Sequence, residues 1–315
     1  MLRLLLGRLA SLVVTLLVAS LLVFVALDVL PGDPAAILLG TAARPDTLAA
    51  LRHQLGLDRP LAVQYLDWIG GMVSGDFGTS VTYGVPVGGL IAERLAVTLP
   101  LALAALLLST LLAVVLGVAA AARRGRAADH AVLGFAQLGI ALPDFWIGLL
   151  LILLFSSELH WFSGGGFPGW EAGIGPALLS LLLPAVALAL PQAGVLTRVV
   201  RGAVLDMLGE DFVRTARAKG LTRRAALWRH AVPNALPPVV TIIGLQLSFL
   251  VAGAVLVENV FALPGLGRLA YQALSQRDLV VLRDVVLLLA AFVIAANFAV
   301  DLAYLALDPR LRHAA

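Results

Sequence analysis

Long runs of apolar residues are the feature of this sequence that most limits its fold. A membrane-spanning helix needs about 20 consecutive apolar residues, and the chain contains such runs at residues 9–30, 96–122, 131–155, 177–197, 238–257 and 285–306. In hydrocarbon every backbone N–H and C=O group must be bonded within the protein, so each run is expected to be helical. The apolar character is continuous and does not alternate as in membrane strands. The sequence therefore predicts an all-α integral membrane protein with about six transmembrane helices.

The composition agrees with this class. The 315 residues are 61% hydrophobic and 13% charged, whereas soluble domains are about 45–50% apolar and about 25% charged. The formal net charge is +3, but the basic residues follow membrane topology and need no anionic partner. The chain has no cysteine, which excludes disulfides and thiolate metal sites.

The first apolar run is predicted to be a retained span. Arg3 and Arg8 precede it, as in a signal peptide, but the run from Leu9 to Leu27 is longer than a typical signal core. It is followed by Pro31-Gly32-Asp33-Pro34, where a signal peptide would have a cleavage site with small residues.

Basic residues are divided unevenly between the two sides that six spans create. If Met1 lies in the cytoplasm, fifteen arginine and lysine residues fall inside and seven outside, which accounts for all 22. The positive-inside rule then places both termini in the cytoplasm. This divides the chain into a first transmembrane helix (1–30), an extracytoplasmic insertion (31–94) and a five-helix core (95–315) with a cytoplasmic loop (198–237).

The extracytoplasmic insertion is predicted to be folded. Asp46 is expected to cap a helix that ends at Leu55, with Gly56 as its stop. Pro60 is expected to open a second short helix, whose aromatic residues, such as Trp68, suit a membrane–water interface.

The spans contain prolines and few ionisable residues. Pro143 in the third span, and Pro184 and Pro191 in the fourth, each remove a helical hydrogen bond and are expected to kink the helix. Such kinks are common in bundles and also suit a helix bent around a pathway. Asp144 and Asp301 lie at a helix break and a helix end, so we expect structural or interfacial roles and no proton transfer. The energy for any transport is therefore expected to come from another protein.

Several catalytic motifs do not occur in the sequence. There is no Gly-x-x-x-x-Gly-Lys-Ser/Thr phosphate loop and no His-Glu-x-x-His metal helix, and the five histidines are dispersed. We therefore expect no catalytic residues, no metal and no cofactor in this chain.

The cytoplasmic loop carries the most specific signal. Glu210 to Gly220 predicts a short helix, because acidic residues at its start and basic residues at its end suit the helix dipole. Gly220 supplies a left-handed stop. Thr222 is expected to cap a second helix that Pro233 ends. The small side chain of Ala216, like that of Ala218, is expected to leave a low surface that a partner can approach.

The composition of this loop also fits a solvated helical hairpin on the bilayer surface. The positions of Ala216, Gly220 and Pro233 relative to one another favour a different interpretation. Ala216-x-x-x-Gly220, followed thirteen residues after the glycine by Pro233, resembles the EAA loop of ABC importer permeases. In that family the loop forms a coupling helix that sits in a groove of the ATPase subunit. Arg214 and Thr215 stand where the general motif has glutamate and alanine. The peptide-type branch is similar in this respect.

Further motifs extend the resemblance over nearly the whole chain, to the dipeptide, oligopeptide and nickel branch of these permeases. Each motif is weak alone, and their order and spacing make them specific together. They are Pro31-Gly32-Asp33-Pro34, Leu55-Gly56-Leu57-Asp58-Arg59-Pro60, Gly75-Asp76-Phe77-Gly78, Leu142-Pro143-Asp144-Phe145-Trp146, Arg214 to Gly220, Glu258-Asn259-Val260-Phe261, Pro264-Gly265-Leu266-Gly267-Arg268, Val300-Asp301-Leu302 and Leu307-Asp308-Pro309-Arg310.

The resemblance implies a fold of the importer-permease (MetI-like) type and a permease subunit with no enzyme activity of its own. Its expected partners are a second homologous permease, two ATP-binding subunits, an extracytoplasmic solute-binding protein and membrane lipid, with no nucleic acid. The expected location is the bacterial cytoplasmic (inner) membrane. The candidate coupling residues are Glu210, Asp211, Arg214, Thr215, Ala216, Arg217, Lys219 and Gly220. Glu210 or Asp211 is the candidate for the acid that the general motif places at position 214.

The sequence indicates the transported substrate less directly than the family. Di- or oligopeptides are the first expectation, because a neutral pathway suits varied peptides better than a cation. Nickel or another small solute of the same branch is the alternative. A stand-alone secondary carrier or channel, or a membrane-embedded hydrolase, belongs to a different class and has little support in the sequence. The residues that line the pathway are not predicted.

Overall fold

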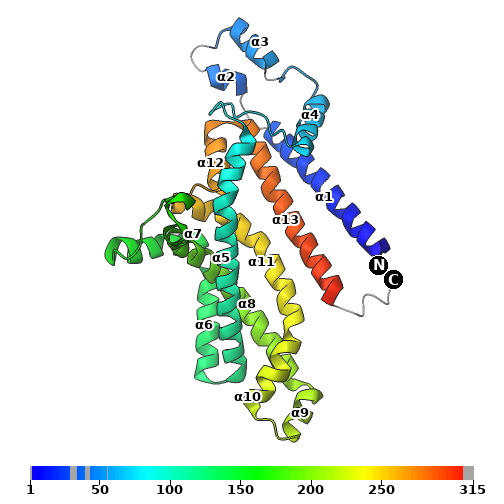
Figure 1. The fold of residues 1–315 in the computed structure, drawn as a ribbon, viewed down its shortest axis with the longest axis vertical. Helices are drawn as coiled ribbons and strands as arrows, with labels where there is room; N and C mark the ends of the chain where they lie inside the picture. Colours follow the sequence, from blue (N-terminus) through cyan, green and yellow to red (C-terminus); the bar gives the residue numbers. More distant parts are fainter. Residues whose placement is uncertain (1, 29–33, 40–42, 55, 308–315) are drawn as a thin grey trace. The chain divides into compact units, whose positions relative to one another are not determined.

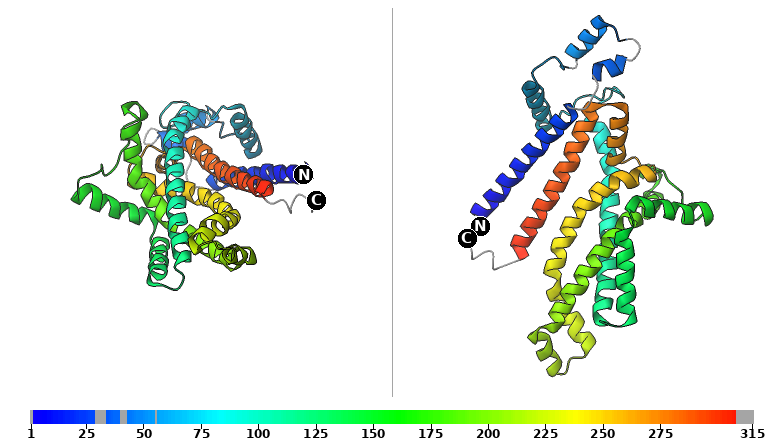
Figure 2. Two further views of the ribbon diagram at one scale, coloured as in Figure 1. Left: turned by 60° about the horizontal axis from the view of Figure 1, so that its bottom comes forward. Right: turned by 180° about the vertical axis from the view of Figure 1, so that it is seen from behind.

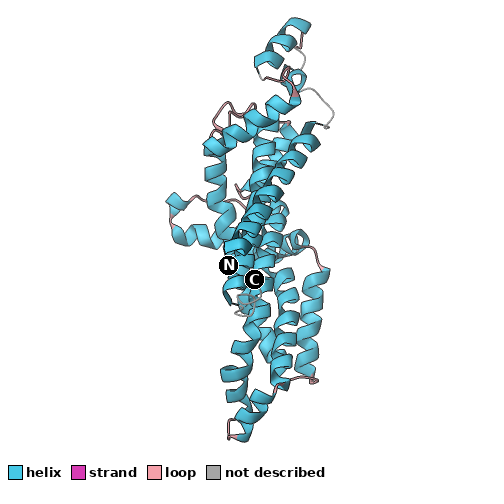
Figure 3. Cartoon of the chain, turned by 90° about the vertical axis from the view of Figure 1, so that its right-hand side faces the viewer, coloured by secondary structure: helices cyan, strands magenta, loops and turns pink. Residues whose placement is uncertain are grey.

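The computed structural model describes residues 2–28, 34–39, 43–54 and 56–307, and these residues fold almost entirely into helices (Figure 3). Within these ranges the strand-like pairing is a single antiparallel bridge between Thr79 and Pro86. The predicted all-α class is therefore confirmed.

Figure 1 labels the α-helices in chain order. Their bounds are α1 Leu2–Asp28, α2 Pro34–Leu39, α3 Pro45–Gln54, α4 Leu61–Ser74, α5 Val87–Ala122, α6 Ala127–Ala141, α7 Asp144–Leu151, the π-helix η2 Ile152–Glu158, the 3-10 helix η3 Trp170–Ala172, α8 Ile174–Gly209, α9 Asp211–Ala218, α10 Arg223–Ala226, the π-helix η4 Leu227–Ala231, α11 Val232–Val260, α12 Leu266–Gln276 and α13 Leu279–Leu307.

Five of the six predicted spans correspond to helices that are long and apolar enough to cross a membrane. The third predicted span, residues 131–155, is not one continuous helix: α6 and α7 meet at a break and are bent by 101°. Leu142 adopts an extended conformation at this break, with φ −97° and ψ 130°. The helical conformation is disfavoured for a residue before proline, and at Pro143 the helix breaks fully where the sequence predicted a kink.

The other prolines in spans behave differently. Pro184 and Pro191 both lie inside α8, which continues through them for 36 residues. Pro100 lies inside α5 in the same way. Among these four prolines, Pro143 stands at a helix break, and Pro100, Pro184 and Pro191 lie within continuous helices.

The chain forms two compact units. Unit 1 contains residues 98–263 and the chain from residue 295 onward, and unit 2 contains residues 2–97 and 264–294. In unit 1, α6 and α11 both pack along α8 (Figure 2). Glycines allow close approach to α8: a Cβ at Gly194 of α8 would lie 2.5 Å from the carbonyl oxygen of Ala136 in α6, and one at Gly117 of α5 would lie 2.8 Å from Cβ of Val200 in α8. Small residues have this role in membrane bundles generally.

Unit 2 has an apolar core around α12 and the start of α13. Buried side chains of Val87, Ile91, Leu269 and Val281 belong to it. A second cluster joins α4 to α1, where the rings of Phe24 and Trp68 stack with centroids 5.9 Å apart. Trp68, expected at a membrane–water interface, is thus buried within the chain.

The helices of the predicted insertion differ from expectation in one detail. Helix α3 begins at Pro45, so Asp46 lies inside the first turn and does not cap the helix. The cap contact comes from Thr47, whose hydroxyl oxygen accepts a hydrogen bond from the backbone N–H of Arg44 at 3.1 Å. Gly56 has φ +67°, as its predicted role as a stop requires, and α4 begins directly after Pro60, as predicted.

Several predictions fall outside the described residues. They concern Pro31-Gly32-Asp33, Leu55, Asp308-Pro309-Arg310 and the side chain of Asp301.

Candidate functional site

The predicted cytoplasmic loop forms a helical hairpin at the end of two long helices. Helix α8 runs for 36 residues to Gly209, and α9 follows after the single residue Glu210. After Gly220 the chain turns back through α10 and η4 into α11, which together form one helix of 38 residues from Arg223 to Val260. We call residues 210–231 the coupling hairpin.

The first arm of the coupling hairpin has the predicted helix. Helix α9 spans Asp211–Ala218, and Glu210 precedes it in an extended conformation with no side-chain cap. Asp211 lies in its first turn and Arg217 in its last, which suits the helix dipole. Gly220 has φ +95°, a conformation that side chains disfavour, so the predicted glycine stop is present.

The two faces of α9 differ sharply. Val213 and Ala216 are buried, at 2% and 8% exposure. Ala216 therefore faces its own chain, and the expectation that it offers a low surface to a partner is wrong. Helical spacing explains this, because residues three apart share a face. The other candidate coupling residues are exposed: Glu210, Asp211, Arg214, Thr215, Arg217, Lys219 and Gly220.

The return arm, residues 221–231, begins at the predicted cap, and its helix continues past the predicted end at Pro233. The Thr222 hydroxyl accepts a hydrogen bond from the backbone N–H of Ala225 at 3.2 Å, which confirms the predicted cap. Pro233 does not end this helix, because it lies in the first turn of α11. The wide π-turn of η4 stands directly before it. A proline removes one helical hydrogen bond, and here the helix accommodates the loss without a break.

The base of the coupling hairpin is held by apolar packing. Leu196, Val200 and Val204 of α8 are buried together with Leu227 and Ala231 of the return arm. This buried apolar contact fixes the return arm against α8.

An ion pair joins α8 to α6. The Arg201 guanidinium donates to both carboxylate oxygens of Asp129, at 2.6 and 2.8 Å. The backbone N–H of Gly125 donates to the same carboxylate at 2.9 Å. Asp129 is 1% exposed, and its partner is 72 residues away in sequence. Local patterns could not have revealed this pairing.

The exposed surface of the coupling hairpin is strongly basic. It has two acidic residues, Glu210 and Asp211, and six basic residues. The basic residues are Arg214, Arg217, Lys219, Arg223, Arg224 and Arg229, all exposed. Arg214 contacts Asp211 at 3.2 Å, but both side chains are in water, and such pairs contribute at most about 1 kcal/mol. The net field around α9 is therefore positive.

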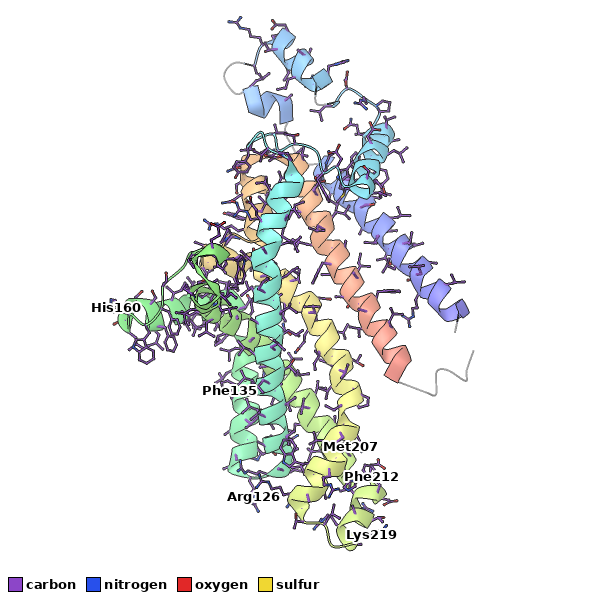
Figure 4. The ribbon with its side chains drawn as sticks, viewed as in Figure 1. Arg126, Phe135, His160, Met207, Phe212 and Lys219 are labelled. Carbon is purple, nitrogen blue, oxygen red and sulfur yellow. The ribbon has the colours of Figure 1, made fainter. Side chains whose placement is uncertain are left out.

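Two aromatic residues of the coupling hairpin were missed by the sequence analysis. Phe212 is 41% exposed and Trp228 is 50% exposed. Figure 4 shows Phe212 and Lys219 at opposite ends of α9. A large apolar side chain between charged neighbours was the available signal, since Asp211 and Arg214 flank Phe212 in sequence.

The Glu258-Asn259-Val260-Phe261 motif closes the opposite end of α11. Glu258 is fully buried, and its carboxylate accepts a hydrogen bond from the Thr98 hydroxyl at 2.6 Å. The ring of Phe261 is buried against Gly148, where a Cβ would lie 2.9 Å from the ring. These contacts give the motif a structural role in unit 1.

Across the part of the chain that the structure describes, no group of three or more histidine, aspartate or glutamate side chains is arranged to hold a metal ion.

Comparison with known proteins identifies the family. Residues 113–313 match the family described as "Binding-protein-dependent transport system inner membrane component". Residues 1–102 match the N-terminal region of the same kind of component. The chain therefore belongs to this family of membrane permease subunits.

Similar curated proteins cover the full chain. A probable peptide ABC transporter permease of Sinorhizobium fredii is 38% identical over 98% of both chains. A putative peptide transport system permease of Brucella abortus is 41% identical over 99% of this chain and 100% of its own length. The glutathione transport system permease GsiC of Salmonella typhimurium is 39% identical over 99% of this chain and 100% of its own.

A solved structure shows the same fold. The structure titled "Inward facing conformations of the MetNI methionine ABC transporter" aligns with a TM-score of 0.56 at 21% identity. The match covers 70% of this chain and 96% of the other. The predicted importer-permease fold is confirmed.

Proposed function

We propose that this chain forms one half of the translocation pathway of an ATP-driven importer for di- or oligopeptides. The relatives named for peptide or glutathione transport support this substrate class, because they are 38–41% identical over almost the full chain. Nickel or another small solute remains the alternative that the same motifs allow.

The coupling hairpin is the observation that carries the mechanism. Helix α9 is short, is stopped by Gly220 and connects α8 to the helix that continues as α11. A rigid push on α9 is therefore delivered to two long helices of unit 1. The exposed candidate residues Glu210, Asp211, Arg214, Thr215, Arg217 and Lys219 make the contact with the ATP-binding subunit.

The proposed assembly contains a second homologous permease, two ATP-binding subunits and an extracytoplasmic solute-binding protein. Both termini and the coupling hairpin lie in the cytoplasm, and residues 31–94 lie outside. The basic residues support this orientation, since fifteen would lie inside and seven outside. ATP is hydrolysed by the partner subunits, and this chain has no phosphate loop of its own.

The test is reconstitution in lipid vesicles with and without the ATP-binding subunits. We expect ATP-dependent uptake of a labelled tripeptide only with all subunits and the binding protein, and no ATP turnover by the purified single chain. A nickel competition assay distinguishes the alternative substrate. ATP hydrolysis by the single chain, or peptide uptake without the ATP-binding subunits, would contradict the proposal.

A further inference from the structure

The four residues between α5 and α6 carry three arginines, and we call residues 123–126 the arginine turn. The side chains of Arg123, Arg124 and Arg126 are all exposed. Asp129 is the acidic residue nearest to the turn in the sequence, and its carboxylate is buried and bonded to α8. The net charge of +3 requires no anionic partner for the chain as a whole, but the arginine turn concentrates positive charge at one place.

The backbone of the arginine turn has a fixed shape. Gly125 has φ +75°, a conformation that favours glycine, and its N–H donates to the Asp129 carboxylate at 2.9 Å. Arg201 of α8 donates two hydrogen bonds to the same carboxylate. The backbone N–H of Arg126 donates to the carbonyl oxygen of Arg123 at 3.0 Å. Membrane topology requires positive charge at one side of the membrane but no particular shape, so the bonded turn indicates a further role.

The arginine turn lies at the level of the lipid headgroups. It follows the apolar stretch 96–122 without a gap, and the next apolar stretch begins at residue 131, five residues after Arg126. Five helical residues cover about 7.5 Å, and one headgroup layer is about 5–8 Å thick. The guanidinium groups therefore stand beside lipid phosphates. By contrast, Arg214 of the coupling hairpin stands 17 residues after the apolar stretch that ends at residue 197.

An exposed apolar stripe of α6 leads to the arginine turn. Ala131, Gly134, Phe135 and Leu138 are exposed, and they share one face of the helix because they are spaced three and four residues apart. Helix α6 packs on α8 through its other face. Figure 4 shows Arg126 at the turn and Phe135 farther along α6. An acyl chain that lies along this stripe has its phosphate beside the arginines.

We propose that the arginine turn and the apolar stripe of α6 together bind one anionic phospholipid of the adjacent leaflet. The arginines hold its phosphate, because guanidinium N–H donors match phosphate oxygens in pairs. Each basic residue near a membrane surface strengthens the attraction of anionic lipid roughly fivefold. The stripe favours a lipid over a soluble phosphate ester, since only a lipid has an acyl chain to cover it. The inference depends neither on the transported substrate nor on the ATP-binding subunits.

The test measures the lipid beside α6 by fluorescence quenching in nanodiscs that contain the full permease complex. The chain has no native cysteine, so the exposed Ala131→Cys can carry one uncharged bimane label next to the turn. Lipids with brominated acyl chains quench this label on contact. We expect brominated phosphatidylglycerol to be preferred over brominated phosphatidylcholine at least fivefold. The same label at Leu107→Cys, 16 residues before Arg123, should show a preference below twofold. An equal preference at both positions would overturn the inference.

The contribution of charge is tested with two triple variants in the Ala131→Cys background. One variant replaces the three arginines of the turn by glutamine, and its matched control replaces three exposed basic residues of the coupling hairpin. The substitutions are Arg123→Gln, Arg124→Gln and Arg126→Gln in the first variant and Arg214→Gln, Arg217→Gln and Lys219→Gln in the control. The first should reduce the preference to below twofold, and the control should keep the preference of the parent. Equal loss in both would show an effect of total charge and would contradict a site at the turn.

The contribution of shape is tested with Gly125→Val, which keeps all three arginines. A valine disfavours φ +75°, and a Cβ at this position meets no other atom within 4 Å, so the change acts on the backbone of the turn. We expect the preference for phosphatidylglycerol to fall at least threefold. An unchanged preference would show the diffuse attraction of any basic membrane surface and would refute a built site.

Two additions to the nanodiscs identify the occupant. Excess glycerol 3-phosphate at constant ionic strength should leave the preference for brominated phosphatidylglycerol unchanged, and so should the ATP-binding subunits. Displacement of the lipid by glycerol 3-phosphate would assign the arginine turn to soluble anions. Displacement by the ATP-binding subunits would assign it to a protein contact. Either displacement would overturn the inference and leave the proposed function intact.

Discussion

The coupling hairpin of unit 1 and the polar corner of unit 2 achieve a fixed shape by opposite means. We define the polar corner as residues 76–86 together with residues 278–284. Asp278 is 1% exposed there and accepts hydrogen bonds from the Ser80 hydroxyl at 2.6 Å and from the backbone N–H of Thr82 at 3.1 Å. It also accepts from the backbone N–H of Val281 at 3.2 Å. One buried carboxylate thus connects two distant segments.

A second buried carboxylate extends this corner to α4. Asp284 is fully buried and accepts a hydrogen bond from the indole N–H of Trp68 at 2.6 Å. The Arg283 guanidinium lies 5.4 Å from the centre of the Trp68 ring. Asp278 and Asp284 of the polar corner are therefore buried and bonded within unit 2.

The coupling hairpin keeps nearly all of its charged side chains in water. Its shape depends on a glycine stop, a threonine cap and apolar packing at its base. A segment that is fixed by its backbone and by apolar packing keeps its charged side chains available to another protein, whereas Asp278 and Asp284 are already engaged within unit 2. The following predictions test this comparison.

The largest expected effect is all-or-none labelling from opposite sides of the membrane. Ala49→Cys in α3 and Ala218→Cys in α9 are both exposed positions in a chain without native cysteine. We expect an impermeant maleimide to label position 49 from outside and position 218 only in inside-out vesicles. Labelling of both positions from one side would contradict the proposed topology.

Loss of the Asp278 carboxylate should strongly destabilise unit 2. Asp278→Ala leaves the buried Ser80 hydroxyl and two backbone donors without their partner. Since each unsatisfied buried group costs about 1–3 kcal/mol, we expect a loss of about 3 kcal/mol in the free energy of unfolding. Thermal unfolding in detergent would measure it.

The control for this variant is Asp46→Ala, at an exposed carboxylate in the first turn of α3. Its effect should stay within about 0.5 kcal/mol. Equal stability of the two variants would show that the polar corner is not held by Asp278.

The glycine stop of the coupling hairpin should have a smaller effect on stability. Gly220 has φ +95° and open space around the position of a Cβ, so the cost of Gly220→Val is backbone strain alone. We expect about 1 kcal/mol or more, together with weaker docking of the ATP-binding subunit and loss of import. Denaturation and vesicle uptake would measure the two effects.

The control is Gly202→Ala in α8, where φ is ordinary and a Cβ meets nothing within 4 Å. It should be neutral or stabilise by up to about 1 kcal/mol and leave import intact. Ala216→Trp should disrupt α9 itself, because Ala216 is buried within the chain. Full import by Gly220→Val would show that the coupling hairpin does not need its stop.

The smallest expected effect is that of Asp144→Asn. Asp144 opens α7, where its carboxylate accepts the backbone N–H of Phe145 at 2.7 Å. An asparagine oxygen can accept the same hydrogen bond, so we expect import to change less than about twofold. Import should also persist when the proton gradient is dissipated at constant ATP. Loss of import under that condition would show that transport is proton-coupled and would contradict the structural roles expected for Asp144 and Asp301.

The sequence by itself determined the class of the fold and the local structure of the site. Apolar runs specify membrane helices because hydrocarbon leaves the backbone no other way to satisfy its hydrogen bonds. The Thr222 cap and the Gly220 stop were also predictable, because a cap and a positive φ depend on one or two residues. The motif spacing selected residues 210–220 as the candidate coupling loop through a family resemblance.

Only the tertiary structure decided which faces are buried and which distant side chains meet. It turned Ala216 inward, left Phe212 and Trp228 exposed, and joined Asp129 to Arg201 across 72 residues. The sequence predicted a kink at each of three prolines, but the chain breaks by 101° at Pro143 and α8 continues through Pro184 and Pro191. Burial and long-range pairing are properties of the packed chain, so no local pattern could specify them.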